Sequence, residues 1–284
     1  MVEGRVIDLH THSNASDGTD PPATVVRLAA LGGLSAVALT DHDTTAGLPA
    51  ARDAAAALSI RLVSGCEIAC ATSAGAVHVL CYFVDSGTQE LTSALGELVA
   101  HRARRNHQLA ELLAKLGLPV TYESALAQAT SEQTLGRPHF ARALVSAGAV
   151  DSVPQAFELW LGVGRPAFVE KAGIAPERAT EAARSGGGVC VLAHPLAYGL
   201  AAGELDALVG ELAAVGFVGI EANYASYDRE QRSGLDALAL AHGLVATGGS
   251  DYHGEMKPDL KVGTGRGDLC VPDEVLERLA ERAP

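Results

Sequence analysis

Histidines and carboxylates follow the ends of several apolar segments in this chain, and the first such segment is Ile7-Asp8-Leu9-His10-Thr11-His12. Residues 5–9 have the β-branched and apolar character of a strand, so a period of two puts Asp8, His10 and His12 on one face. Two imidazoles at that spacing can bind one cation, and Asp8 could orient one of the rings from behind. The alternative is a pair of hydrogen-bonded histidines at a strand end.

The same residue types recur after later apolar runs. Run 35–40 leads into Asp41 and His42, run 61–63 into Glu67, run 189–193 into His194, and run 244–247 into Asp251 and His253. Because the active site of a parallel α/β barrel lies at the C-terminal ends of its strands, we expect these side chains to meet at one mouth. His78 lies within run 76–84 and joins them if that strand lines the barrel, although a mid-strand histidine is more often a packed core residue.

This set of ligands indicates a metal centre with more than one ion. Imidazole and carboxylate ligands without a thiolate suit Mn²⁺, Fe²⁺ or Zn²⁺ alike. One ion takes about four to six ligands, whereas the chain offers about nine candidates, which favours two or three ions with a carboxylate such as Glu67 as a bridge. Two close ions stabilise the attacking and leaving oxygens of a phosphoryl displacement.

The order of the segments predicts an α/β barrel that carries an insertion. The chain has 284 residues, of which 48% are hydrophobic, enough for one large barrel core. Strand-like runs alternate with amphipathic helical runs in the first and last parts of the chain. The middle is helical instead, with helices predicted at 91–116, 122–129, 138–147 and 153–161. We therefore predict a barrel domain of residues 1–87 and 174–284, with a helical insertion of residues 88–173 over the barrel mouth.

Charge and composition exclude several other classes of protein. The net charge of -13 disfavours a general nucleic-acid-binding surface, so we expect no stable DNA partner. The basic run 101–107 is expected to be a solvated helix face. No apolar run approaches membrane-spanning length, and we expect a cytoplasmic protein without a membrane partner. The five cysteines lie mostly in apolar runs and are expected to act as small core residues.

Taken together, these segments resemble the PHP (polymerase and histidinol phosphatase) family. The resemblance covers the barrel and rests on Asp8 to Ser13, Asp17-Gly18, Leu39 to Asp43, Gly65-Cys66-Glu67, His78, Ala193-His194-Pro195 and Gly249 to His253. It implies a distorted (β/α)7 TIM-like barrel with a trinuclear metal centre that hydrolyses phosphoesters. It also implies one metal on His10, His12, Glu67 and Asp251, a second on Glu67, His78 and His194, and a third on Asp17, His42 and His253. Asp8 and Asp41 would then lie just behind the ligands, and Asp17 departs from the branch of the family that has histidine there. We expect manganese, with iron and zinc as alternatives.

The segment from Gly136 to Val145 resembles one subgroup of this family, the 3′,5′-nucleoside bisphosphate phosphatases, some relatives of which trim short RNA from the 5′ end. The resemblance makes the insertion the substrate-binding domain. Arg137 offers a bidentate fork for a phosphate, and His139 could donate to the phosphate or to a leaving oxygen. A surface arginine and a partly buried helix histidine are the alternatives. Ser226 and Tyr227 could contact a base or ribose, or Tyr227 could be local packing.

We therefore expect a metal-dependent phosphatase that hydrolyses a phosphomonoester of nucleoside 3′,5′-bisphosphates, with short RNA as a further substrate. Another phosphoesterase of the same family, acting on histidinol phosphate or on a cyclic phosphodiester, is the nearest alternative. A catalytically silent metal-binding scaffold is the alternative from another class.

Overall fold

The computed structural model describes residues 6–129, 131–132, 134–170 and 172–284. Within these residues the chain divides into two compact units, one formed by Met1–Gly96 and Gly173–Pro284 and the other by Glu97–Ala172. The predicted insertion begins at residue 88, whereas the second unit begins inside helix α3 (Gln89–Lys115). Helix α3 belongs to both units, because its first turn is bonded to the barrel unit: Arg178 Nη2 donates to Glu90 O at 3.5 Å.

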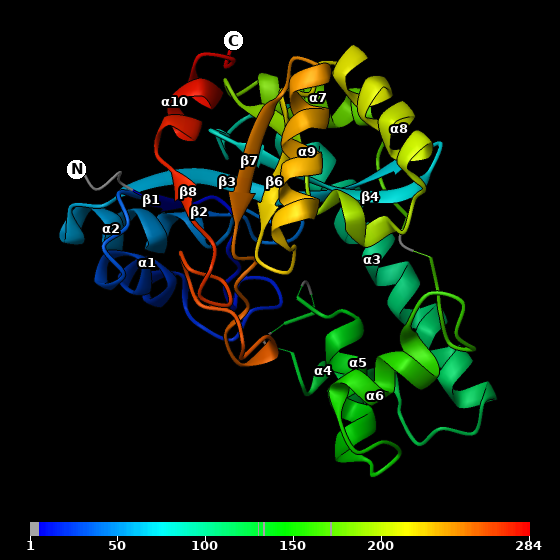
Figure 1. Cartoon of the computed structure of the whole chain (residues 1–284). Helices are drawn as coiled ribbons and strands as arrows, with labels where there is room; N and C mark the ends of the chain where they lie inside the picture. The colour runs from blue at the N-terminus through cyan, green and yellow to red at the C-terminus, as the bar shows by residue number, and fades with distance from the viewer. Residues whose placement is uncertain (1–5, 130, 133, 171) are drawn as a thin grey trace. The chain divides into compact units, whose positions relative to one another are not determined.

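The first unit is a mixed α/β fold around one nearly closed eight-stranded barrel (Figure 1). Its strands are β1 (Val6–Asp8), β2 (Ala36–Leu39), β3 (Arg61–Thr72), β4 (Gly75–Tyr82), β5 (Val189–Leu192), β6 (Gly219–Tyr224), β7 (Val245–Gly249) and β8 (Val271–Pro272). The strand order is β7-β6-β5-β4-β3-β2-β1-β8. Backbone hydrogen bonds from Leu9 N to Gly248 O (3.2 Å) and from Asp251 N to His10 O (2.8 Å) bring the ends of β1 and β7 together. The predicted TIM-like α/β barrel is confirmed.

Strand β4 runs against its neighbours, and this reversal matters for the site. It pairs antiparallel with β3 and with β5, whereas β1, β2 and β3 are parallel to one another, as are β5, β6 and β7. Strands β3 and β4 form a hairpin, since Thr72 pairs with Gly75. The strand predicted to begin at residues 61–63 and to end at Glu67 is longer in the structure, because β3 continues to Thr72 on the hydrogen bonds of β4.

Helices cover the outside of the strands in the order that a βα repeat requires. They are α1 (Pro22–Leu31), α2 (Leu48–Leu58), α7 (Pro176–Arg184), α8 (Ala202–Ala214), α9 (Arg229–Ala241) and α10 (Glu274–Ala280), with short turns η2 (Pro195–Tyr198) and η3 (Gly254–Met256). Their ends follow local chemistry: Pro22 opens α1, and Asp228 caps α9 by accepting from Gln231 N at 2.8 Å. Among the described residues, no helix combines the length and the apolar character needed to span a membrane.

The barrel interior is filled by side chains of the strands and closed at one end by helix α10. Ile7, Val63, Val191 and Val245 share a buried cluster with residues of α10, namely Val275, Leu276 and Leu279. Strand β8 and helix α10 were not predicted, because two strand residues and seven helix residues are too few to show a period. They place the C-terminal segment beside β1, as Figure 1 shows by the red and blue ends of the chain.

The second unit is helical and has its own core. It contains the rest of α3 with α4 (Tyr122–Leu126), α5 (Arg137–Ser146), α6 (Val153–Ala156) and the π-helical turn η1 (Phe157–Leu161). Leu109, Leu113, Phe140 and Leu144 are buried in one apolar cluster. The basic run on α3 is not a purely solvated face, since Arg102 and Arg105 are only 9% and 8% exposed. An arginine can bury its stem against apolar neighbours, which is the reason the charge pattern alone misjudged this face.

Candidate metal centre

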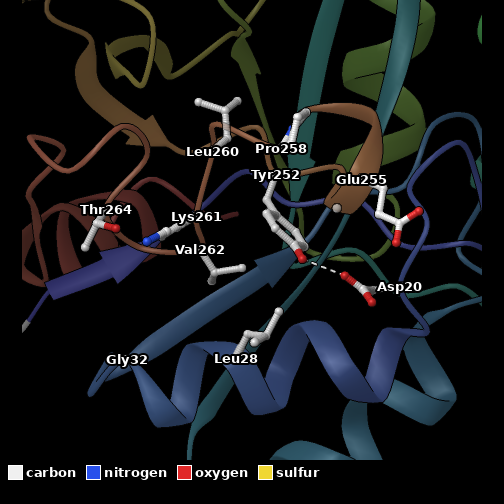
Figure 2. A pocket seen from close by; sticks show the side chains of 11 residues that line it. Asp20, Leu28, Gly32, Tyr252, Glu255, Pro258, Leu260, Lys261, Val262 and Thr264 are labelled. Atoms are coloured by element: carbon white, nitrogen blue, oxygen red, sulfur yellow. Dashed lines mark hydrogen bonds between the residues drawn. The ribbon is translucent and has the colours of Figure 1, made fainter.

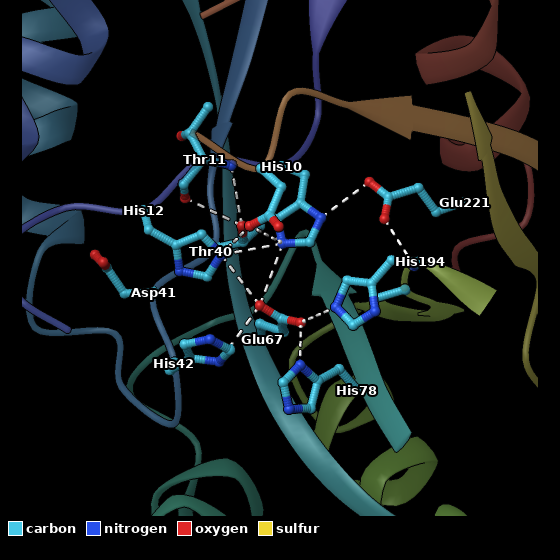
Figure 3. A network of polar contacts seen from close by, with 12 residues as sticks. His10, Thr11, His12, Thr40, Asp41, His42, Glu67, His78, His194 and Glu221 are labelled. Carbon is cyan, nitrogen blue, oxygen red and sulfur yellow. Dashed lines mark hydrogen bonds and ion pairs between the residues drawn. The ribbon is translucent and has the colours of Figure 1, made fainter. Parts of the chain in front are cut away.

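Glu67 is the residue around which the other ligand candidates gather (Figure 3). Its side chain is 1% exposed. Oε1 lies 2.8 Å from His78 Nδ1 and 3.0 Å from His194 Nε2, while Oε2 lies 3.2 Å from His10 Nε2, 3.1 Å from His12 Nε2 and 3.3 Å from His42 Nδ1. The two oxygens of one carboxylate thus face two different sets of imidazoles. This is the geometry required of a carboxylate that bridges two ions.

The strand directions explain why these rings meet. His10 and His12 follow β1, His194 follows β5, and all three lie at the C-terminal ends of parallel strands. His78 lies in the first half of β4, but β4 is reversed, so this half of the strand reaches the same mouth. Glu67 lies in the middle of β3. Its backbone forms an isolated parallel β-bridge with His42, which lies beyond the end of β2.

The described residues contain three overlapping groups that could each hold a divalent ion. These groups are His10, His12 and Glu67; His42, Glu67 and His78; and His12, Asp17, His42 and His253. Asp251 extends the first group, since its Oδ1 lies 3.5 Å from His10 Nε2 and 3.4 Å from His12 Nε2. His194 extends the second through Glu67 Oε1. All nine predicted ligands therefore lie in one cluster. His12 belongs to both the first and the third group, and His42 to both the second and the third.

The spacing within the cluster fits coordination of a metal ion. Bonds from zinc-like ions to nitrogen or carboxylate oxygen measure about 2.0–2.2 Å, so neighbouring ligand atoms around one ion lie roughly 3 Å apart. His10 Nε2 and His12 Nε2 lie 3.0 Å apart, and both lie 3.1–3.2 Å from Glu67 Oε2. The two imidazole nitrogens and the carboxylate oxygen therefore face one common point, at which all three could bind the same cation.

Electrostatics favour the protonation state that metal binding needs at three of the ligands, Glu67, Asp251 and His12. Burial by itself raises the pKa of Glu67, but His42, His78 and His10 outweigh it and hold that pKa well below its usual value. Burial likewise raises the pKa of Asp251, and the nearby Lys257 and His253 reverse the shift. Burial and the neighbouring His253 lower the pKa of His12, which favours the neutral imidazole that coordinates metals.

Glu221 is a residue of this site that the sequence did not reveal. It is fully buried in the middle of β6, and its Oε1 lies 2.9 Å from His10 Nδ1. Its Oε2 accepts a hydrogen bond from His194 N at 2.8 Å. A carboxylate on the far nitrogen of a metal-binding imidazole fixes the ring orientation and its tautomer. Glu221 therefore performs the task that the sequence suggested for Asp8.

Asp8 and Asp41 hold backbone segments instead of rings. Asp8 accepts from the backbone N–H groups of His10 (3.2 Å), Ser250 (2.9 Å) and Gly263 (2.7 Å), and its expected contact with a histidine ring is not what the structure shows. The reason is that these backbone N–H groups, two of them from the segment that follows β7, engage both oxygens of the Asp8 carboxylate. Asp41 accepts from Ser13 N, Ser13 Oγ and Ser16 Oγ, each at 2.7 Å, and so fixes the turn that leads to Asp17.

The segment after β7 brings the side chains of Asp251, His253 and Lys257 to the cluster. Asp251 has a left-handed backbone with φ 52°, which is uncommon outside glycine and asparagine-like residues, and this turns its side chain into the cluster. Oδ2 of Asp251 accepts from Tyr224 Oη at 2.6 Å and from Lys257 Nζ. Burial lowers the pKa of Lys257, but the Asp251 carboxylate outweighs this and raises it, so the lysine stays charged. Neither Tyr224 nor Lys257 was predicted at the site, because no short motif joins them to Asp251.

The same segment is fastened to the turn that carries Asp17. Thr19 N donates to His253 O at 3.2 Å, and Tyr252 Oη donates to Asp20 Oδ2 at 2.5 Å. Figure 2 shows this tyrosine–aspartate bond at the wall of a cavity of about 620 Å³, which Leu28, Pro258, Leu260 and Lys261 also line. The bonds tie Asp17 and His253 together, and their side chains lie 3.3 Å apart (Asp17 Oδ1 to His253 Nε2).

Gly249, the last residue of β7, lies directly against His10. A Cβ at Gly249 would lie 2.4 Å from His10 Cβ and 2.5 Å from His10 N, so backbone would have to move. We expect Gly249→Ala to lower the free energy of unfolding by about 1–3 kcal/mol and to reduce metal content, because it displaces His10. Urea unfolding and metal analysis would measure this.

Gly234→Ala is the matched control for that substitution. Gly234 lies inside α9 and an added Cβ would meet nothing within 4 Å. This change should stabilise the protein by about 0.5–1 kcal/mol, since alanine is the better helix former. Equal metal content in Gly249→Ala and in the wild type would contradict the assigned role of the close approach.

The predicted substrate residues lie in two places. Arg137 and His139 belong to the second unit, at the start of α5. Arg137 Nη1 donates to Leu161 O at 3.5 Å and its guanidinium lies 5.6 Å from the centre of the Phe168 ring, while His139 is 3% exposed and its Nδ1 accepts from Gly136 N at 3.0 Å. Ser226 is exposed after β6. Tyr227 is 7% exposed and its oxygen accepts from Leu196 N at 2.8 Å, which favours the packing alternative for this residue.

Known proteins with a similar sequence or structure act on phosphate esters. The PHP domain family matches residues 8–137. A 5′-3′ exoribonuclease of Haemophilus influenzae is 35% identical over 246 residues, which cover 87% of this chain and 89% of that protein. A 3′,5′-nucleoside bisphosphate phosphatase of Chromobacterium violaceum is 32% identical over 247 residues, with 87% of each chain covered. A solved structure from Bifidobacterium adolescentis, assigned as a metal-dependent phosphoesterase, superposes with a TM-score of 0.86 at 32% identity over 99% of this chain and 97% of that one.

The two relatives match over 87% of this chain and the solved structure over 99% of it, and the family match includes the segments that carry His10, His12, Asp17, His42, Glu67 and His78. The arrangement of Glu67 between two sets of imidazoles agrees with the metal dependence of such enzymes. The chain belongs to the PHP family of metal-dependent phosphoesterases and is a hydrolase that cleaves phosphate esters.

Proposed function

We propose that this protein is a phosphatase that removes a phosphate group from nucleoside 3′,5′-bisphosphates with the help of two or three divalent ions. The single observation that carries the metal part is the division of the Glu67 oxygens between His78 and His194 on one side and His10, His12 and His42 on the other. The substrate part is supported by the 3′,5′-nucleoside bisphosphate phosphatase among the relatives.

The proposed ligand sets follow the three groups of the cluster. His10, His12, Glu67 and Asp251 would hold one ion, Glu67, His78 and His194 a second, and Asp17, His42 and His253 a third. A set of imidazoles and carboxylates without thiolates suits manganese, and also iron or zinc. The bound ions would supply Lewis-acid stabilisation of the phosphoryl oxygens and an activated nucleophile for in-line displacement. Glu221 keeps the His10 ring in place during the reaction by holding its Nδ1.

The second unit is the proposed specificity element. Arg137 offers two parallel N–H donors, which match the geometry of a phosphate, and such pairs are stronger than neutral hydrogen bonds. Its guanidinium over Phe168 limits the orientations of the side chain, so less entropy is lost when a phosphate binds. His139 and Ser226 are proposed to contact the substrate, His139 at the phosphate or the leaving oxygen.

Phosphate release from a panel of substrates tests this proposal. We expect kcat/KM for adenosine 3′,5′-bisphosphate to exceed that for AMP or histidinol phosphate by about 10- to 100-fold, because the second phosphate gains a charge-assisted hydrogen bond of about 1.5–3 kcal/mol. The panel should include a short 5′-phosphorylated RNA and a cyclic phosphodiester, since relatives named as exoribonucleases share this fold.

Each outcome of the panel has a separate meaning. Equal rates on all monoesters would contradict the bisphosphate assignment, and a faster reaction with histidinol phosphate or the cyclic diester would replace it with that activity. Metal-loaded protein that releases no phosphate from any member would favour the catalytically silent scaffold. The Glu67→Ala protein is the control for phosphate released by contaminating enzymes.

A further inference from the structure

Lys257 is a charged residue of the cluster for which the ligand sets give no role. It directly follows η3, and Lys257 N donates to Gly254 O at 3.1 Å, so a short hydrogen-bonded turn connects it to His253. Its ammonium group donates to Asp251 Oδ2. Within the contacts described for the cluster, it is the side chain that carries a permanent positive charge.

The contacts of Asp251 separate metal binding from the lysine. Oδ1 faces the imidazoles, at 3.2 Å from His253 Nδ1 and 3.4 Å from His12 Nε2. Oδ2 faces the opposite way and accepts from both Tyr224 Oη, at 2.6 Å, and Lys257 Nζ. Tyr224 alone already donates a short hydrogen bond that orients this oxygen. A lysine is therefore more than the carboxylate needs for positioning.

The ammonium group also has capacity for another ligand. A lysine has three N–H donors, and the contact with Asp251 uses one of them. The side chain is 37% exposed, in contrast to 6% for Asp251, so part of it is open to solvent at the edge of the cluster. The carboxylates of Asp17 and Glu67 act on the same ammonium group, which puts it in the field of all three ligand groups.

We propose that Lys257 is a phosphate-binding residue of this enzyme, which holds an oxygen of the substrate phosphoryl group while Asp251 holds the ammonium group. This inference rests on the proposed phosphatase function. A lysine binds phosphate as a point charge, and a charge-assisted hydrogen bond beside the reacting group stabilises the additional negative charge that develops there.

Binding of inorganic phosphate, the product, tests the proposal without depending on turnover. We would measure metal content, the dissociation constant for phosphate by calorimetry and its inhibition constant for Lys257→Met, Lys257→Arg and Tyr224→Phe in the full-length, metal-loaded protein. Lys257→Met should keep the metal content of the wild type and bind phosphate about 10- to 100-fold more weakly, the range for loss of a hydrogen bond to a charged group. Lys257→Arg should restore most of the affinity, because it restores the charge.

Tyr224→Phe is the matched control, because it removes a donor from the same oxygen without removing a charge. It should change phosphate affinity by at most about threefold. Equal losses in Tyr224→Phe and Lys257→Met, loss of metal from Lys257→Met, or unchanged phosphate affinity in Lys257→Met would each overturn the proposal and leave Lys257 as a positioning residue for Asp251. If the wild type binds phosphate but cleaves no phosphoester, the proposed function fails and the phosphate affinities still decide the role of Lys257.

Discussion

Glu67→Ala is expected to lose more than one equivalent of divalent metal and at least about a thousandfold in kcat/KM on every substrate. The reason is that the two oxygens of Glu67 serve different imidazole sets, at 2.8–3.0 Å on one side and 3.1–3.3 Å on the other, so one substitution damages two ion sites. Several kcal/mol of charge stabilisation depend on such ions, and each 1.36 kcal/mol is a factor of ten in rate. Metal analysis and steady-state kinetics on the same sample measure both effects.

A matched control is available on the surface of the barrel. Glu211 is an exposed glutamate whose Oε2 accepts from Ser73 Oγ at 2.7 Å, and Glu211→Ala should keep both metal and turnover. Circular dichroism would establish that both variants are folded. A single tightly bound ion in the wild type, together with a Glu67→Ala protein that remains active, would remove the multinuclear centre.

Arg137→Lys and His42→Ala are expected to fail in different ways, because one residue is proposed to bind substrate and the other to bind metal. Arg137→Lys should keep the metal and lose about 2–3 kcal/mol of transition-state stabilisation for the bisphosphate, as expected for loss of a charge-assisted hydrogen bond, with a much smaller change for a generic monophosphate. His42→Ala should lower the occupancy of the third ion and reduce turnover of all substrates alike, because His42 lies 3.3 Å from Glu67 and 3.8 Å from Asp17.

Steady-state kinetics of both variants on both substrates, with metal measured on the same preparations, distinguish these roles. Arg142→Lys is the matched control, because Arg142 lies on the same helix α5 and donates to Gln128 O at 2.8 Å. It should leave the preference for the bisphosphate unchanged. If Arg137→Lys reduced both substrates equally or stripped metal, Arg137 would be a structural residue that packs on Phe168, and the second unit would not be the specificity element.

Periodicity along single segments was enough to predict the barrel and most of the ligand candidates. Alternation puts His10 and His12 on one face of one strand, and buried apolar runs such as 35–40 are strand-like because both faces of a barrel wall are covered. Asp17 was found only through the resemblance to the family, since nothing in its own segment marks it as a ligand. Its contacts, 3.3 Å to His253 and 3.8 Å to His42, connect segments that are far apart in the chain.

Only the tertiary structure decided which atoms form hydrogen bonds with one another. Glu221 is 211 positions from His10, so no spacing rule relates them, and the pair exists because β6 and β1 end at the same mouth of the barrel. The Asp8 side chain shares a face with His10, as its sequence position requires, yet its oxygens bind the backbone of Ser250 and Gly263. A carboxylate accepts from whichever donors the packed neighbours present, and those donors come from the other end of the chain.

The sequence by itself determined the kinds of atoms available, imidazole nitrogens and carboxylate oxygens without thiolates, and their positions at strand ends, and with these the class of chemistry. The tertiary structure decided the bridging role of Glu67, the inclusion of His78 through the reversed strand β4, and the presence of Tyr224 and Lys257 on Asp251. The physical reason is that periodicity is a property of one segment, whereas hydrogen bonds and ligand sets depend on distances of about 3 Å between segments, which are fixed only when strand order, direction and register are known.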